Sequence, residues 1–115
     1  MSSPFSYAFT VSRGREELRL SGEIDIATCP TLVEALNAVV AHPGGDVLLD
    51  CSRVTFFGVA GVGALVEARK ELDRSGRRLV VRNPSPIVRR VLHIFELADV
   101  FADDEYKSAD PTPHE

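Results

Sequence analysis

Two short, uninterrupted apolar runs, at residues 47–49 and 79–81, limit the fold of this chain more than any other feature. A strand that is apolar at consecutive positions must be covered on both faces, as happens in a parallel sheet. Between the runs, residues 59–75 carry apolar positions at helical spacing, and Gly76 is placed to end that helix in a left-handed conformation. This order of strand, helix and strand predicts parallel pairing with a right-handed crossover.

The first part of the chain has the pattern of a β-hairpin. Large apolar residues alternate with small ones (Ser6, Ala8 and Thr10) over residues 5–11, as in a strand with one buried face, and the alternation resumes at Leu18 and Leu20. Residues 12–16 between them are polar and contain Gly14, so we expect a turn there.

Two further helices are expected. Pro30 stands near the start of an amphipathic pattern that extends to Val40, and Ser85 is suited to cap a third helix with Pro86 at its first position. Residues 100–101 would add an optional last strand. We therefore predict an α/β fold with a mixed sheet of four or five strands, opened by a hairpin and packed with three main helices.

Length and charge restrict the function. The 115 residues fit one domain, which we place at residues 5–102, while residues 103–115 are acidic, contain two prolines and are expected to be a flexible tail. The net charge of −4 argues against nucleic acid as a partner. The longest nearly apolar stretch has about 13 residues, against the roughly 20 that span a bilayer, and no secretory signal is visible. We expect a cytoplasmic protein without direct membrane insertion.

No motif indicates an enzyme, a metal or a cofactor. Cys29 and Cys51 lack zinc-site spacing and are expected to be reduced thiols. The glycines at 58, 61 and 63 lack the ending of a phosphate-binding loop, so close packing of a helix explains them better. The five arginines between residues 77 and 90 are interpreted as a solvated face, and nothing marks a sizeable apolar pocket.

Residues 47–62 run from a buried strand through a short loop into a helix. Their sequence, Val-Leu-Leu-Asp-Cys-Ser-Arg-Val-Thr-Phe-Phe-Gly-Val-Ala-Gly-Val, resembles the STAS family, the domain shared by sulphate transporters and anti-sigma factor antagonists. The resemblance includes residues 20–25 (Leu-Ser-Gly-Glu-Ile-Asp) with Thr28, and residues 83–92 after the second apolar run. It covers roughly residues 6–102, and the order and spacing of these pieces make it specific.

The resemblance implies a particular chemistry for the loop. In switched family members the loop reads Phe-x-Asp-Ser-Ser-Gly, and a partner that is both kinase and anti-sigma factor phosphorylates the second serine. Aligning Phe56 and Gly61 puts Gly58 at the aspartate, Val59 at the first serine and Ala60 at the phospho-acceptor. Because alanine has no hydroxyl group, no phosphorylation is expected there, and the loop would stay uncharged and competent to bind.

The family resemblance thus implies a regulatory binding module of the anti-sigma factor antagonist type, whose partner is an anti-sigma factor of the kinase type. The candidate partner-binding residues are Asp25, Gly58, Val59, Ala60, Gly61 and Val62. The rival hypothesis is a loop that no longer binds any such kinase. An alternative function is that of a STAS subunit in an ABC-type lipid transporter complex, and a homodimer is left open.

Three further points stay open at this stage. Asp25 either contacts the partner or forms a turn in which Thr28 caps the helix. Asp50, at the end of a strand, either forms a turn or takes part in chemistry. Ser52 or Thr55 could accept a phosphoryl group in place of residue 60, although hydrogen bonds to the local backbone are the better explanation for both.

Overall fold

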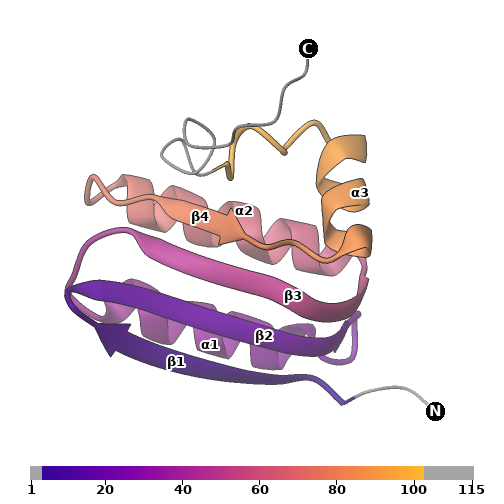
Figure 1. The fold of residues 1–115 in the computed structure, drawn as a ribbon, viewed down its shortest axis with the longest axis horizontal. Helices are drawn as coiled ribbons and strands as arrows, with labels where there is room; N and C mark the ends of the chain where they lie inside the picture. Colours follow the sequence, from indigo (N-terminus) through magenta and orange to yellow (C-terminus); the bar gives the residue numbers. More distant parts are fainter. Residues whose placement is uncertain (1–3, 103–115) are drawn as a thin grey trace.

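The computed structural model describes residues 4–102, which form a four-stranded sheet and three helices (Figure 1). The predicted α/β class, with an opening hairpin and a mixed sheet, is confirmed. The expected tail, residues 103–115, lies outside the described residues. The elements are β1 (Ser6–Ser12), β2 (Arg15–Ile24), α1 (Cys29–Ala41), β3 (Val47–Phe57), α2 (Val59–Asp73), β4 (Leu79–Arg82) and α3 (Pro86–Ile94).

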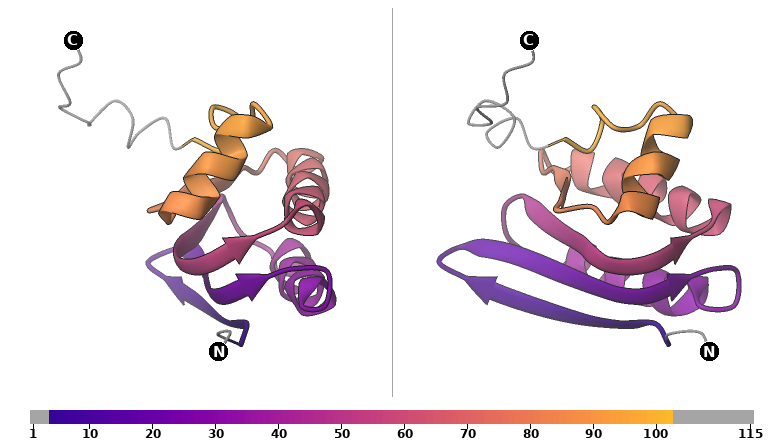
Figure 2. Two further views of the ribbon diagram at one scale, coloured as in Figure 1. Left: turned by 90° about the vertical axis from the view of Figure 1, so that its right-hand side faces the viewer. Right: turned by 45° about the vertical axis from the view of Figure 1, so that its right-hand side comes forward.

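The strands lie in the sheet in the same order as in the chain, β1-β2-β3-β4. β1 is antiparallel to β2, whereas β2, β3 and β4 are parallel. The crossovers from β2 to β3 and from β3 to β4 are both expected to be right-handed. Because both also move in the same direction across the sheet, their helices lie on the same face. Accordingly, α1 and α2 lie side by side behind the sheet, and α3 packs against β3 across the strand direction (Figures 1 and 2).

The hairpin turn is tighter than expected. Arg13 and Gly14 both have positive φ, at 52° and 76°, and Ser12 pairs directly with Arg15. Two consecutive residues with positive φ fit the right-handed twist of a hairpin. Glu16, which was expected in the turn, is therefore part of β2 and is buried.

The main core lies between the sheet and the pair α1 and α2. The run at 79–81 is buried throughout, as predicted, but Leu48 in the first run is only half-buried because β3 is less covered on the open face of the sheet. The least exposed core residues come from both layers: Leu18, Leu20, Val47 and Leu49 from strands, and Leu32, Val39, Leu65 and Leu72 from helices.

β1 lacks the buried face that its alternation predicted. Tyr7 is 41% exposed and Val11 is 52% exposed, while Phe5 and Phe9 are half-buried. The prediction was wrong because β1 is the outermost strand of the sheet, and the helices cover its apolar side only in part. An alternating pattern indicates which residues share a face but not whether another layer covers that face.

The optional fifth strand at residues 100–101 was also wrong, because these residues form a turn. Phe101 nevertheless buries its side chain to 1% exposure, and its carbonyl accepts a hydrogen bond from the Val81 N–H at 2.9 Å. This hydrogen bond satisfies the Val81 N–H at the edge of β4 without forming a ladder.

The helix ends follow the predicted signals. Gly76 has a φ of +70°, and the Arg77 N–H donates to the Leu72 carbonyl at 3.0 Å, which closes the end of α2. The Ser85 hydroxyl accepts the Val88 N–H at 3.5 Å and caps α3.

Arg77 does not belong to a solvated face. It is 8% exposed, and its guanidinium donates to Glu16 Oε1 at 3.0 Å and to the Gly45 carbonyl at 2.8 Å. Glu16 is 2% exposed, and a Cβ at Gly44 would collide with its carboxylate. This ion pair ties β2 to the loops that enter β3 and β4, whereas the neighbouring Arg78 is exposed as expected.

We expect Arg77→Ala to lower the free energy of unfolding by about 3–5 kcal/mol, because it removes the guanidinium that pairs with the buried Glu16 carboxylate and leaves only the His42 ring, at 3.6 Å, beside it. Urea unfolding followed by circular dichroism measures this. Arg74→Ala is the matched control, since Arg74 pairs with Glu71 on the surface and such a pair contributes about 1 kcal/mol or less. Equal losses in the two variants would contradict the role given to Arg77.

Candidate functional site

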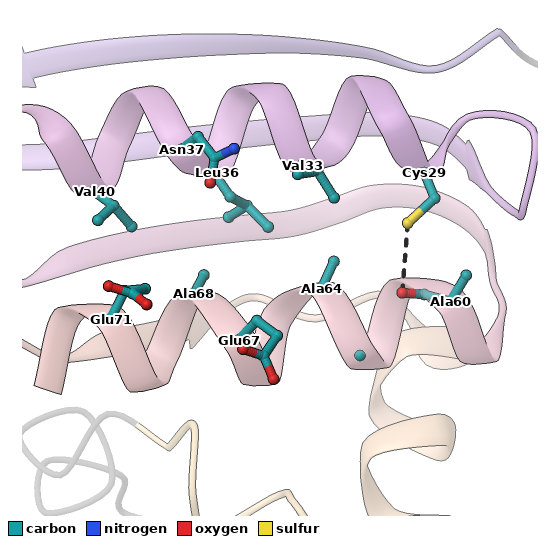
Figure 3. Close-up of a pocket in the computed structure, with 11 residues that line it drawn as sticks. Cys29, Val33, Leu36, Asn37, Val40, Ala60, Ala64, Glu67, Ala68 and Glu71 are labelled. Atoms are coloured by element: carbon teal, nitrogen blue, oxygen red, sulfur yellow. Dashed lines mark hydrogen bonds between the residues drawn. The ribbon is translucent and has the colours of Figure 1, made fainter.

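The loop from β2 to α1 and the loop from β3 to α2 meet at the carboxyl end of the sheet. The Gly58 N–H donates to the Ile24 carbonyl at 2.8 Å. The Cys29 Sγ lies 3.5 Å from the Ala60 carbonyl, to which the thiol is a weak donor (Figure 3). The structure therefore brings together the two loops that hold the candidate residues.

Asp25 fixes the conformation of its own loop. Its Oδ1 accepts the Thr28 N–H at 2.9 Å, and its N–H donates to the Thr28 Oγ1 at 2.9 Å. The Thr28 hydroxyl donates to the Glu23 carbonyl at 2.8 Å, so the Thr28 side chain does not cap α1 as expected. These reciprocal bonds give Asp25 the turn-forming role, and a partner contact through Asp25 stays a proposal.

β3 is irregular just before the loop. Arg19 of β2 pairs with Asp50, and Ser21 pairs with Arg53, so β3 contains one more residue than β2 over this stretch. A second shift in the pairing lies between Gly22 and Glu23 of β2. The Asp50 Oδ1 accepts the Ser52 N–H at 2.9 Å, which supports the first bulge. Asp50 thus has a role in shaping the strand, and bulges of this kind increase the local twist of a strand.

Gly61 is required where α2 leaves the sheet. A Cβ at Gly61 would lie 2.7 Å from the Ile24 Cγ2 and 2.7 Å from the Phe57 Cε1. At Gly63 the same atom would have nothing within 4 Å. Close packing of the helix therefore explains Gly61, as predicted, but it does not explain Gly63.

The loop residues differ in what they offer to a partner. Val59 is 70% exposed and Ala60 is half-buried, whereas Gly61 is buried and Val62 is only 6% exposed. Gly58 is extended and serves as the N-cap of α2 without a side chain to cap it. Val59 and Ala60 are thus within reach of a partner, and Gly61 and Val62 lie beneath them.

Two exposed apolar side chains beside the loop were missing from the candidate residues. Ile26 is 84% exposed and Phe56 is 47% exposed, and both lie within two residues of the hydrogen bond between Gly58 and Ile24. Together with Val59 they form the apolar rim. Ile26 continues the alternation of β2 beyond the end of the strand, so nothing in the sequence pattern indicates that it is exposed.

A groove of about 400 Å³ runs between α1 and α2 and begins at Ala60. Figure 3 shows Ala60, Ala64 and Ala68 on α2 facing Val33 and other apolar residues on α1. The sequence analysis had found no mark of a sizeable apolar pocket, yet apolar side chains make up most of the lining of this groove. The alanines at intervals of four residues on α2 were a usable signal, because small side chains on one helix leave space beside its neighbour.

The family of this chain follows from a direct comparison. The family model described as "Mlab, STAS domain" matches residues 8–102. This chain belongs to the STAS family. The STAS domain is 34% identical over 103 residues to the anti-sigma-F factor antagonist RsfB of Mycobacterium tuberculosis, across 88% of this chain and 84% of that protein.

Solved structures share the fold of this STAS domain. The crystal structure of an anti-sigma factor antagonist from Mycobacterium paratuberculosis matches with a TM-score of 0.78 and 29% identity, over 95% of this chain and 97% of that chain. The anti-sigma factor antagonist SpoIIAA in its unphosphorylated form matches with a TM-score of 0.71 and 24% identity, over 90% and 93% of the two chains. The likeness to SpoIIAA concerns the fold alone.

The two thiols of the STAS domain have different surroundings. Cys51 is 1% exposed in β3, and burial, followed by the charge of Asp50, raises the pKa of its thiol to about 12. Cys29 is partly exposed beside Ala60, and both thiols are free. Cys51 is therefore a neutral core residue at physiological pH.

Among residues 4–102, no group of three or more His, Cys, Asp or Glu side chains could hold a metal ion. In the same residues, no helix is both long enough and apolar enough to cross a membrane.

We expect Gly61→Ala to lower the free energy of unfolding by about 1–2 kcal/mol, because overpacking against Ile24 and Phe57 outweighs the gain in helix propensity. Gly63→Ala, where the Cβ is free, should raise it by up to about 1 kcal/mol. Thermal and urea unfolding of the two variants measure the difference. A stabilising Gly61→Ala would show that α2 does not pack against the sheet as described.

Proposed function

We propose that this STAS domain is a regulatory protein of the anti-sigma factor antagonist type, which binds an anti-sigma factor of the kinase type in the cytoplasm and acts by binding, not by catalysis. The observation that carries the proposal is the meeting of the two loops, which sets Ala60 beside the exposed apolar rim. Relatives with 34% and 29% identity that are named anti-sigma factor antagonists support it.

The position of Ala60 in α2 explains the effect of having alanine there in place of a serine that could be phosphorylated. Ala60 is the second residue of α2, where backbone N–H groups are free of helical partners and negative charge is favoured. A phosphoserine there would bring roughly −1.5 to −2 charges to the surface next to the apolar rim. Alanine cannot accept that group, so we propose that the loop stays uncharged and that binding is constitutive.

The apolar rim supplies the contact that a partner would bury. Ile26 and Val59 are exposed well beyond half of their surface, and Phe56 for nearly half. Complete burial of such a side chain contributes about 1.5–3 kcal/mol relative to the exposed state. All three lie on or next to the two joined loops, and in a protein interface a few such residues contribute most of the affinity.

The other hypotheses have less support. Nothing among the relatives named above favours a subunit of an ABC-type lipid transporter complex, so we propose no second function. A loop that has lost its partner is the rival within the proposed function, and the binding experiments below separate it from constitutive binding.

We expect Ala60→Glu to raise the Kd for the anti-sigma factor at least tenfold, a loss of about 1.4 kcal/mol, because it puts a charge into an apolar contact. The anti-sigma factors of the source cells are expressed singly and titrated against the domain by calorimetry. Ala98→Glu is the control, since Ala98 is exposed in the turn after α3. If wild type and both variants bind equally, the loop is not the interface; if wild type binds none of them, the rival holds.

We expect Ile26→Ala and Phe56→Ala each to raise the same Kd by roughly 5- to 30-fold, as for residues at the centre of an interface. Ile94→Ala is the control, because Ile94 is an apolar residue with 64% exposure on α3. All three positions are exposed, so folding should be unchanged, which thermal unfolding verifies. A larger effect at Ile94 than at Ile26 would move the interface away from the rim.

A further inference from the structure

β1 is one of the two edge strands of the sheet, and no other strand pairs with its outer side within residues 4–102 (Figure 2). Its sequence, Ser-Tyr-Ala-Phe-Thr-Val-Ser, has neither a charged residue nor a proline. Its pairing with β2 is continuous over all seven residues, without a bulge. Charged side chains, prolines and bulges are the means by which sheets prevent another strand from joining an edge, and β1 lacks them.

The apolar side chains of β1 are left partly open at this edge. Tyr7 and Val11 are 41% and 52% exposed, and they lie on the same face as Phe9 between them. The Phe9 ring makes an edge contact with the ring of His42 at the end of α1, at 5.5 Å between centroids. The exposed row therefore lies on the helical side of the sheet, beside α1.

We infer that β1 pairs antiparallel with β1 of a second copy of this chain, around a two-fold axis at Phe9. In that register Tyr7 lies opposite the partner's Val11, and Ala8 lies opposite the partner's Thr10. The large apolar residues of both copies then share one face, the small residues (Ser6, Ala8, Thr10 and Ser12) share the other, and no like charges meet within the strand. A two-fold interface requires a patch that is complementary to itself, and this seven-residue sequence has that property around its centre.

The exposed residues of β1 favour a second copy of this chain as the partner at this edge. The pairing joins two four-stranded sheets into one, satisfies the edge backbone groups of both copies, and covers Tyr7 and Val11 with the same residues of the other copy. β1 is separated from β3 and the Ala60 loop by β2, so the dimer leaves the candidate binding surface open. The inference does not depend on the proposed function.

Sedimentation equilibrium of the whole chain tests the dimer. Wild type should show a monomer–dimer equilibrium, and Val11→Lys should raise the dimer Kd by roughly tenfold or more, because each dimer carries the substitution twice. Val100→Lys is the matched control, an exposed valine away from β1, and should leave the Kd unchanged. A wild type that stays monomeric up to about 1 mM, or a dimer that both variants weaken equally, would overturn the inference.

Disulfide trapping tests the register. In a Cys29→Ser background, Tyr7→Cys combined with Val11→Cys should form a covalent dimer on mild oxidation, since directly opposed residues lie within disulfide range. Tyr7→Cys alone should form little, because its symmetry mate lies four residues away along the strand. Cys51 is buried and should not react. Covalent dimer from the single variant in equal yield would contradict pairing around Phe9.

Discussion

The parallel pairing of β2 with β3 is the constraint on which the rest of this structure depends. Because of this pairing, the carboxyl ends of both strands lie next to each other, and the chain continues into α1 and α2 from adjacent points. The hydrogen bond from Gly58 to Ile24 fixes the two exits together, and the missing side chain of Gly61 lets α2 start directly over Ile24 and Phe57. Without this pairing, Ala60 would have no fixed relation to the β2–α1 loop.

The opposite end of the sheet is held by a different interaction. The ion pair between Glu16 and Arg77 is buried and connects β2 with the loops that lead into β3 and β4. Removing one partner of such a pair is costly because the other charge stays buried, although the intact pair adds little net stability. The amino ends of the parallel strands are thus anchored by charge, whereas apolar side chains are exposed near the carboxyl ends, where the groove between α1 and α2 begins.

Local signals in the sequence predicted local structure well. Gly76 and Ser85 ended and began helices as expected, because each acts within a few residues of itself. The ion pair between Glu16 and Arg77 joins residues 61 positions apart, and polar composition alone suggested solvent for both. The exposure of Tyr7 and Ile26 depends on which layer covers each strand end, and neither alternation nor family resemblance encodes that. The loop at Ala60 was found only because a family motif exists with which to compare it.

The central claim is that the uncharged loop at Ala60 gives this STAS domain a binding surface without a phosphorylation switch. The most direct measurement is the Kd for its anti-sigma factor before and after incubation of the complex with ATP, with intact mass recorded for the STAS domain. The account predicts an unchanged Kd and no added phosphoryl group. Phosphorylation at another hydroxyl, such as that of Ser52 or Thr55, together with release of the partner, would contradict it.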